Sequence, residues 1–220
     1  MGQRPERQTE RSTAARRDRT ASALNWRCLS LAALLAGCAG GDIRPVGLTP
    51  ESSVAPGRIA EIEHWRADGR IAVQRGNEGW SAKMRWLKGA ASFQLRFIAP
   101  LGRGTYQLAG DNSRVELIVP NGQRFYAADA QSLMTEHLGW SLPLAGAHYW
   151  LRGLVAPDPP PSYARHDAAG LLQDLHQGGW RISVVRRMSV EGFELPAKLF
   201  MSYNDIKIRI VISSWTLTPQ

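Results

Sequence analysis

The sequence predicts a mainly β fold of the α+β class, in which about eleven short strands form an antiparallel sheet that curls. Apolar and polar residues alternate through most of the chain after Ala67, and turn-forming residues separate the alternating segments. Both cysteines, Cys28 and Cys38, lie near the N-terminus, so the rest of the chain contains neither a disulfide nor a thiolate metal site. The fold must therefore be stabilised by its hydrophobic core.

The first 37 residues have the organisation of an export signal. A polar, Arg-rich stretch (1–27) precedes the short apolar run Cys28–Ala36, which is too short to span a bilayer as a helix. The following Leu35-Ala36-Gly37-Cys38 resembles a bacterial lipoprotein signal, although a chance run of small residues is the alternative. We expect residues 1–37 to be removed and Cys38 to carry an N-acyl diacylglycerol group, which would anchor the chain to a membrane.

The segment after the cysteine suggests a tether and a destination. Ala39, rather than Asp, follows Cys38, and by resemblance to bacterial sorting this favours the outer membrane, with the protein facing the periplasm. Residues 38–57 are rich in Gly, Pro and Ser without apolar periodicity, which is typical of a flexible linker. Residues 58–220 are expected to form one folded domain.

The charge of the chain does not indicate a nucleic-acid partner. The formal net charge is +8, but residues 1–37 contain seven Arg and three acidic residues. The remainder contains 20 Lys and Arg against 16 Asp and Glu, and the basic residues are scattered. Basic residues distributed singly through alternating segments usually form a solvated face.

The clearest strands are Gly79–Leu87 and Ser92–Ile98. In the first, Trp80, Met84 and Trp86 share one face, opposite Ser, Lys and Arg. The other predicted strands are Gly69–Gln74, Gly104–Ala109, Arg114–Val119, Gln123–Ala127, Gly170–His176, Gly179–Val185, Ala197–Tyr203 and Lys207–Ser214.

Helical patterns occur at three places. One or two amphipathic turns are predicted for Arg58–Trp65. A helix over Ala130–Leu138 has Asp129 as its N-cap, and Pro143 opens another that continues to Leu151. The proline-rich stretch 157–161 is expected to be extended.

The sequence contains no recognisable catalytic or metal-binding motif. The five histidines are not spaced as metal ligands, and no nucleophile or nucleotide motif is present. Asp167 and Asp174 could form a carboxylate pair, but acidic residues in a polar connection are usually solvated. We therefore predict that the protein is not an enzyme. We also predict no metal site and no cofactor other than the acyl group.

Large apolar side chains are concentrated on the predicted inward faces of the strands. The simplest interpretation is that they fill the core of a curled sheet. A sheet of about eleven strands can also enclose more space than its side chains fill, and a cavity for lipid under the helices is the alternative. The residues concerned are Trp65, Trp80, Trp86, Phe93, Phe97, Trp150, Trp180, Phe200 and Trp215, with alternating Ile from 206 to 212.

A predicted turn follows the strand that ends at Ile98. Pro100 and Gly102 favour a tight turn, and the residue between them is Leu101, where a polar residue would be usual. An isolated exposed leucine is common. Close to a lipid anchor, however, an apolar loop tip can enter a bilayer.

Taken together, the motifs resemble the LolB family of outer-membrane lipoproteins over essentially the whole of the chain after the cysteine. Each motif is modest, but their order and spacing are specific. They are Trp65 with Gly69-Arg70-Ile71-Ala72, the strand through Trp86, Ala99-Pro100-Leu101-Gly102, Asn121–Ala130, Leu142-Pro143-Leu144, Trp150–Leu154, Gly179-Trp180 and Trp215.

The resemblance implies an open half-barrel of about eleven antiparallel strands with a helical lid over an apolar cavity. It also implies a monomer that receives lipoproteins from a LolA-like periplasmic carrier, shelters their acyl chains and inserts them into the outer-membrane lipid. The family's membrane-insertion leucine falls on Leu101, although the following Arg103-Gly104 departs from the expected loop. We expect the acyl-chain cavity to be lined by Trp80, Met84, Trp86, Phe93, Leu95, Phe97 and Trp150.

Two other functions remain open on the sequence alone. One is a binding module for a different lipid, and the other is a structural lipoprotein of an outer-membrane assembly with a filled core.

Overall fold

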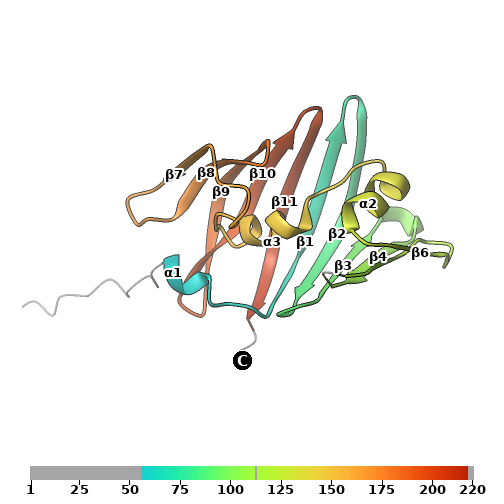
Figure 1. Cartoon of the computed structure of the whole chain (residues 1–220), viewed down its shortest axis with the longest axis horizontal. Helices are drawn as coiled ribbons and strands as arrows, with labels where there is room; N and C mark the ends of the chain where they lie inside the picture. The colour runs from blue at the N-terminus through green and yellow to red at the C-terminus, as the bar shows by residue number, and fades with distance from the viewer. Residues whose placement is uncertain (1–55, 112, 218–220) are drawn as a thin grey trace, which may run out of the picture. The chain divides into compact units, whose positions relative to one another are not determined.

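The computed structural model describes residues 56–111 and 113–217, so the predicted signal, Cys38 and most of the tether lie outside the described residues. The described chain forms one antiparallel sheet of eleven strands with helices on one face (Figure 1). The strands are β1 (Trp65–Arg75), β2 (Glu78–Lys88), β3 (Phe93–Ile98), β4 (Thr105–Gly110), β5 (Val115–Ile118), β6 (Arg124–Ala127), β7 (Tyr163–His166), β8 (Leu172–Gln177), β9 (Trp180–Val190), β10 (Phe193–Tyr203) and β11 (Ile206–Leu217).

The strand order is β6-β5-β4-β3-β2-β1-β11-β10-β9-β8-β7. The chain enters at the centre of the sheet, runs outward to β6, crosses over and returns from β7 to β11, which pairs with β1. Within the described residues the edge strands β6 and β7 are not paired with each other, so the sheet remains open. The predicted antiparallel sheet of about eleven strands is confirmed.

The crossing segment between the two edges carries α2 (Ala130–Leu138) and α3 (Leu144–Leu151), which lie in front of the sheet in Figure 1. Asp129 caps α2 as predicted, since its carboxylate accepts a hydrogen bond from the backbone N–H of Ser132 at 2.9 Å. Gly139 ends α2 in the left-handed conformation, with φ of 75°. The two helices therefore cover one face of the sheet as separate short elements.

The covered face contains the hydrophobic core. Trp65 packs against Trp86 and Trp215, with ring centroids 5.7 and 5.3 Å away. A second aromatic group joins Trp80 and Phe97 of the sheet to Trp140, which lies between α2 and α3. We call this covered side the inner face and the opposite side the outer face.

One predicted helix was wrong in its limits, and one strand was not predicted. The helix near the start, α1, covers only Pro56–Ile59, and Trp65 already belongs to β1. The strand β7 was not predicted, because all four of its residues are exposed and it therefore has no apolar alternation. It is held as a strand by its pairing with β8.

One aromatic residue was placed on the wrong face. Phe200 was expected to point inward but is 42% exposed. Its neighbours Leu199 and Met201 are buried, and a register shift lies just before them, between Pro196 and Lys198. Because successive residues of a strand face opposite sides, Phe200 lies on the outer face.

Candidate functional site

A narrow cleft separates the inner face of the sheet from the two helices. Its volume is about 230 Å³. Trp86, Phe93 and Val115 line it from the sheet, and Leu144 and His148 line it from α3. Such a space accommodates less than one long acyl chain, so an extended apolar ligand could enter only if the helices moved away from the sheet.

The seven residues expected to line an acyl-chain cavity lie in two different environments. Trp86 and Phe93 line the cleft. Trp80 packs at the edge of the core, and Met84, Leu95, Phe97 and Trp150 are buried within it. All seven therefore lie in or against the core on the inner face, but they are not brought together around one open cavity.

Some of the core's polar groups have no partner. Among the described residues, the indole nitrogens of Trp86 and Trp140 are buried without a hydrogen-bond acceptor. An unsatisfied buried donor costs about 1–3 kcal/mol. Both indoles belong to the region covered by the helices, and Trp86 also borders the cleft.

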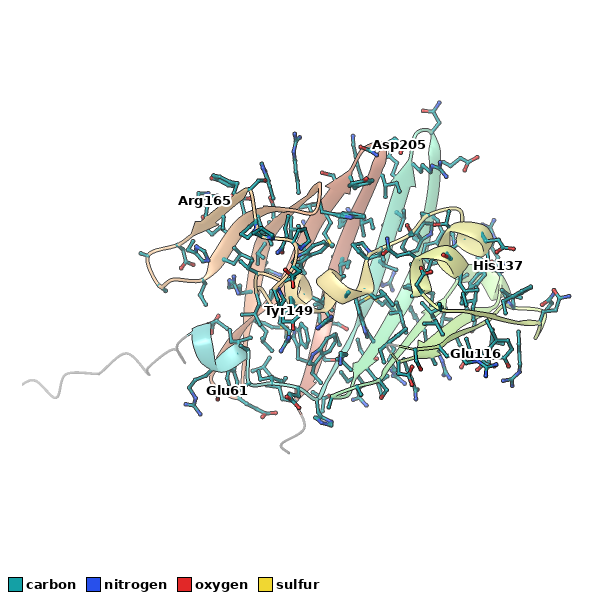
Figure 2. The ribbon with its side chains drawn as sticks, viewed as in Figure 1. Glu61, Glu116, His137, Tyr149, Arg165 and Asp205 are labelled. Carbon is teal, nitrogen blue, oxygen red and sulfur yellow. The ribbon has the colours of Figure 1, made fainter. Side chains whose placement is uncertain are left out.

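A buried arginine connects α3 to the segment that precedes β1. Arg152 is only 5% exposed, and its guanidinium donates to the carbonyls of Ile62 at 2.6 Å and Ile59 at 3.3 Å. It also donates to the carbonyl of His148 at 3.2 Å. Burial lowers the pKa of Arg152. Tyr149, whose ring lies 5.3 Å from this guanidinium, is seen over the sheet in Figure 2.

A buried glutamine holds the far end of α3 to the sheet. Gln177 of β8 accepts hydrogen bonds from the indole of Trp150 at 2.7 Å and from the backbone N–H of Ala156 at 3.0 Å. Its amide group donates to the carbonyls of Ala156 and Pro159, both at 2.7 Å. The predicted cavity residue Trp150 is therefore fixed in the core by a specific polar contact.

Neither Arg152 nor Gln177 was singled out from the sequence. A basic residue just after a helix is common because it interacts favourably with the helix terminus, so Arg152 gave no sign of burial. Gln177 occupies an ordinary strand position next to a Gly-Gly turn. Their partners are distant in sequence, and only the folded chain brings them together.

The loop between β3 and β4 projects a leucine into solvent. Leu101 is 93% exposed and lies within a short 3₁₀ turn, η1 (Pro100–Gly102). Its backbone is left-handed, with φ of 57°, a conformation that non-glycine residues seldom adopt. The backbone N–H of Ala99 donates to the carbonyl of Gly104 at 3.0 Å and closes the base of the loop.

Gly104 lies at the base of the loop, where the chain packs against another hairpin. Its φ is 92°, and a Cβ atom there would lie 2.3 Å from Cβ of Pro120, in the turn between β5 and β6. The loop base is therefore packed closely against the neighbouring hairpin, which requires glycine. The structure thus places Pro100, Leu101 and Gly102 together at an exposed tip on a fixed base.

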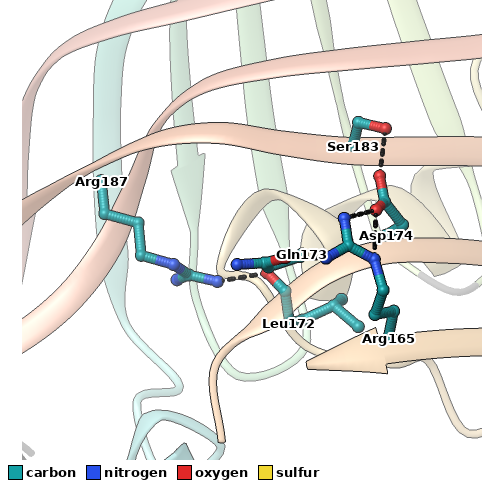
Figure 3. A network of polar contacts seen from close by, with 6 residues as sticks. All are labelled: Arg165, Leu172, Gln173, Asp174, Ser183 and Arg187. Carbon is teal, nitrogen blue, oxygen red and sulfur yellow. Dashed lines mark hydrogen bonds and ion pairs between the residues drawn. The ribbon is translucent and has the colours of Figure 1, made fainter. Parts of the chain in front are cut away.

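The carboxylates considered as a catalytic pair have structural partners. Asp174 is paired with Arg165 and accepts a hydrogen bond from the hydroxyl of Ser183, and this bond is the main cause that lowers its pKa (Figure 3). Asp167 accepts backbone hydrogen bonds from Ala169 and Leu171 within a turn. Neither carboxylate is positioned to act on the other.

The described residues show no group of three or more His, Cys, Asp or Glu side chains that could hold a metal ion. Nor is any described helix long and apolar enough to cross a membrane.

An open antiparallel sheet, apolar on the face that two short helices cover and carrying a projecting leucine, defines a protein of the kind that handles lipid. The model of the family described as "Outer membrane lipoprotein LolB" matches residues 63–215. The chain belongs to the LolB family, and it is accordingly an outer-membrane lipoprotein that acts as a receptor for lipoproteins.

Two relatives named as outer-membrane lipoprotein LolB agree with this assignment. The chain is 38% identical to the outer-membrane lipoprotein LolB of Nitrosococcus oceani over 159 residues, which are 72% of this chain and 79% of the relative. It is 32% identical to that of Pseudomonas aeruginosa over 84% of this chain and 92% of the relative. Among solved structures, a LolA superfamily protein from Nitrosomonas europaea superposes with a TM-score of 0.48 and 8% identity, over 76% of this chain and 95% of that one.

Proposed function

We propose that this protein, anchored through an acylated Cys38 and tethered by residues 38–57, receives lipoproteins from a LolA-like periplasmic carrier. It shelters their acyl chains between the inner face and the helices, and then inserts them into the outer membrane. It acts as a monomer and without catalysis. The exposed position of Leu101 at the tip of the β3–β4 loop is the observation that carries this proposal.

Shelter of the acyl chains requires α2 and α3 to separate from the sheet. The cleft of about 230 Å³ is the space already present, bordered by Trp86 and Phe93. Glycines with positive φ follow both helices, Gly139 after α2 and Gly153 after α3, and such positions can absorb backbone rotation. Acyl chains would then replace the helix contacts with Trp80, Phe97 and the rest of the inner face, so the core residues predicted from the sequence become the walls of the opened cavity.

The physical need for shelter is large. Each methylene that leaves an apolar environment for water costs about 0.8 kcal/mol, so several exposed acyl chains would cost tens of kcal/mol. Transfer between two apolar sites avoids this barrier. A difference of about 1.4 kcal/mol in affinity is enough to favour the acceptor tenfold, so no chemical energy source is needed.

The insertion step is tested by Leu101→Glu. A carboxylate at the loop tip would oppose entry into the bilayer, whereas a leucine contributes about 1.5–3 kcal/mol when it is buried there. We expect the variant to fold and to take a fluorescent lipoprotein from the carrier normally, but to deliver it to vesicles at least about tenfold more slowly. Transfer is measured by flotation of the vesicles.

The matched control is Arg103→Glu, which introduces the same side chain at an exposed position of the same loop. It should deliver lipoprotein at a rate close to that of the parent. Normal delivery by Leu101→Glu would refute the assigned role of the loop. Failure of the parent protein to take up cargo from the carrier would refute the proposed function.

A further inference from the structure

A row of basic side chains crosses the outer face of the sheet, on the side opposite the helices. The strand register places Arg70 directly opposite Lys83, and Arg186 directly opposite Lys198. Val211 of β11 lies between the two pairs, opposite both Lys198 and Arg70. The row across β9, β10, β11, β1, β2 and β3 reads Arg186, Lys198, Val211, Arg70, Lys83 and Ile98.

This row contains like charges directly opposite each other, which destabilises a sheet. Elsewhere in the sheet, cations are paired with acids on neighbouring strands, as Arg85 is with Asp68 at 2.5 Å and Arg124 with Glu116 at 2.7 Å. In the part of the chain that the structure describes, by contrast, the side chains of Arg70, Lys83, Arg186 and Arg209 form no ion pair or hydrogen bond. Repulsion between these cations therefore destabilises the sheet, and an external anion bound among them would remove this repulsion.

The cations line a groove that the Leu101 loop borders. The groove has a volume of about 750 Å³, and no acidic residue lines it. Arg209 belongs to the adjacent row, between Phe200 and Ala72, and adds a fifth positive charge. On the loop side, the lining consists of Ile98, Ala99, Pro100 and Leu101.

Apolar side chains are exposed along the border of these charges. Leu101 is 93% exposed and Ile98 43% exposed. Phe200, which points outward, is 42% exposed, and the Lys198 ammonium lies 5.1 Å from its ring centroid. Cations adjacent to exposed apolar groups are typical of surfaces that rest on an anionic lipid interface.

We propose that this outer-face groove binds the phosphate headgroup of an anionic phospholipid, such as phosphatidylglycerol, while Leu101 enters the adjacent acyl region. The headgroup neutralises the opposed cations, and each of them strengthens attachment to an anionic surface roughly fivefold. Binding there brings the end of the outer face that borders the Leu101 loop to the bilayer and leaves the helices and the cleft facing the periplasm. This site goes beyond the proposed function, since it requires neither cargo nor carrier.

Protection of a thiol in the groove tests this site. Cys28 and Cys38 are the only cysteines of the chain, and in the acylated mature protein neither should offer a free thiol. Ser81→Cys introduces one in the groove, where Ser81 is exposed, and Gln94→Cys introduces one at the other end of the outer face. Each acylated variant is placed in nanodiscs of phosphatidylcholine alone or with phosphatidylglycerol, and its reaction rate with a water-soluble maleimide is measured.

We expect phosphatidylglycerol to slow labelling of Ser81→Cys roughly tenfold or more, while Gln94→Cys reacts at similar rates in both nanodiscs. Adding Lys83→Gln and Arg209→Gln to Ser81→Cys should abolish the protection. Equal rates at Ser81→Cys, or equal slowing at both positions, would overturn the proposal. Protection in phosphatidylcholine nanodiscs by inorganic phosphate alone would also overturn it, because the ligand would then be a soluble anion.

No cargo is present in this experiment, so its failure removes only the headgroup site. Failure of the parent protein to take cargo from the carrier would instead remove the proposed function. The two results are therefore distinguishable.

Discussion

Gly69 shows how closely the two central strands approach each other. A Cβ atom at this position would lie 2.2 Å from the backbone carbonyl oxygen of Val211 and 2.9 Å from Cα of Ile212. The register of β1 and β11 shifts between Asp68 and Gly69, so the ladder is irregular at this point. Because β1 and β11 join the two halves of the sheet, this contact affects the whole core.

Gly69→Ala should therefore destabilise the protein by about 2 kcal/mol or more, since the obstructing atoms belong to the backbone and cannot rotate away. The free energy of unfolding is measured by denaturant titration. Gly79→Ala is the matched control, because Gly79 lies in the neighbouring strand β2 and a Cβ atom there would have no other atom within 4 Å. Equal effects of the two substitutions would show that close packing at Gly69 is not the cause.

Leu101 shows how much of a site a single residue's context can predict. Pro100 and Gly102 on either side predicted a tight turn, and the structure gives one. Neither turn chemistry nor composition determined that Leu101 itself takes the left-handed conformation and remains almost wholly exposed. The base of this loop packs, through Gly104, against Pro120 of another hairpin, and the local sequence does not indicate this contact.

At the scale of elements, α3 carries a titratable group into a half-buried position. His148 contacts the carbonyl of Leu144 through Nδ1 at 3.0 Å. Burial lowers the pKa of His148, with the Leu144 carbonyl acting in the opposite direction, and the cations Arg152 and Lys88 lower it further. Protonation of His148 therefore disfavours the folded state, in which α3 is docked on the sheet.

The sign of the pH dependence follows from this shift. The folded pKa of His148 lies below its ordinary value of 6.5, so its neutral form stabilises the fold above that pH, and stability is lost as pH falls through 6.5 toward the folded pKa. The carboxylates with lowered pKa, such as Asp129 and Asp174, have ordinary values of 3.8 and act only at lower pH.

We therefore expect the denaturant midpoint to fall between about pH 7.5 and about pH 5.5, and His148→Gln to reduce this fall. The midpoints of the parent and the variant are compared across this range. His166→Gln is the control, because its side chain is exposed on β7. An unchanged pH profile in His148→Gln would show that another group is responsible.

The elements that were predicted well are those whose sequence pattern matches their burial. β2 and β3 alternate between the core and solvent, and α2 has a capping aspartate and a terminal glycine. β7 has no buried residue, and the face of Phe200 depends on a register shift in β10. Local pattern cannot reveal either feature, since both arise from pairing with distant strands.

The same limit applies to the outer-face groove. Arg70, Lys83, Arg186 and Lys198 are far apart in the sequence, and each by itself is an ordinary solvent-facing strand residue. They were interpreted as scattered charge. Only the register, which pairs β1 with β2 and β9 with β10, places them side by side. A charge pattern across strands becomes visible once pairing is known.

At the scale of the whole described fold, the sheet separates the two proposed binding surfaces. The cleft lies on the inner face beneath α2 and α3, and the basic groove lies on the outer face beside the Leu101 loop. The lining of the cleft includes Trp86 and His148, whereas the groove is lined by different residues. Because the two linings share no residue, a substitution on one face should leave binding at the other unchanged.

Ala145→Trp tests this independence. Ala145 is exposed on α3 and lines the cleft, so a tryptophan should be tolerated by the fold while its indole occupies much of the 230 Å³ available. We expect affinity for a fluorescent palmitoylated peptide to fall roughly tenfold. A tenfold loss corresponds to about 1.4 kcal/mol of binding free energy, which is less than the contribution of two buried methylenes. Ala164→Trp, at an exposed position of β7 outside the cleft, should bind the peptide like the parent.

Both variants should retain the phosphatidylglycerol-dependent protection of Ser81→Cys. Undiminished peptide binding by Ala145→Trp would mean that acyl chains enter elsewhere, and loss of that protection would mean that the two faces are coupled through the sheet.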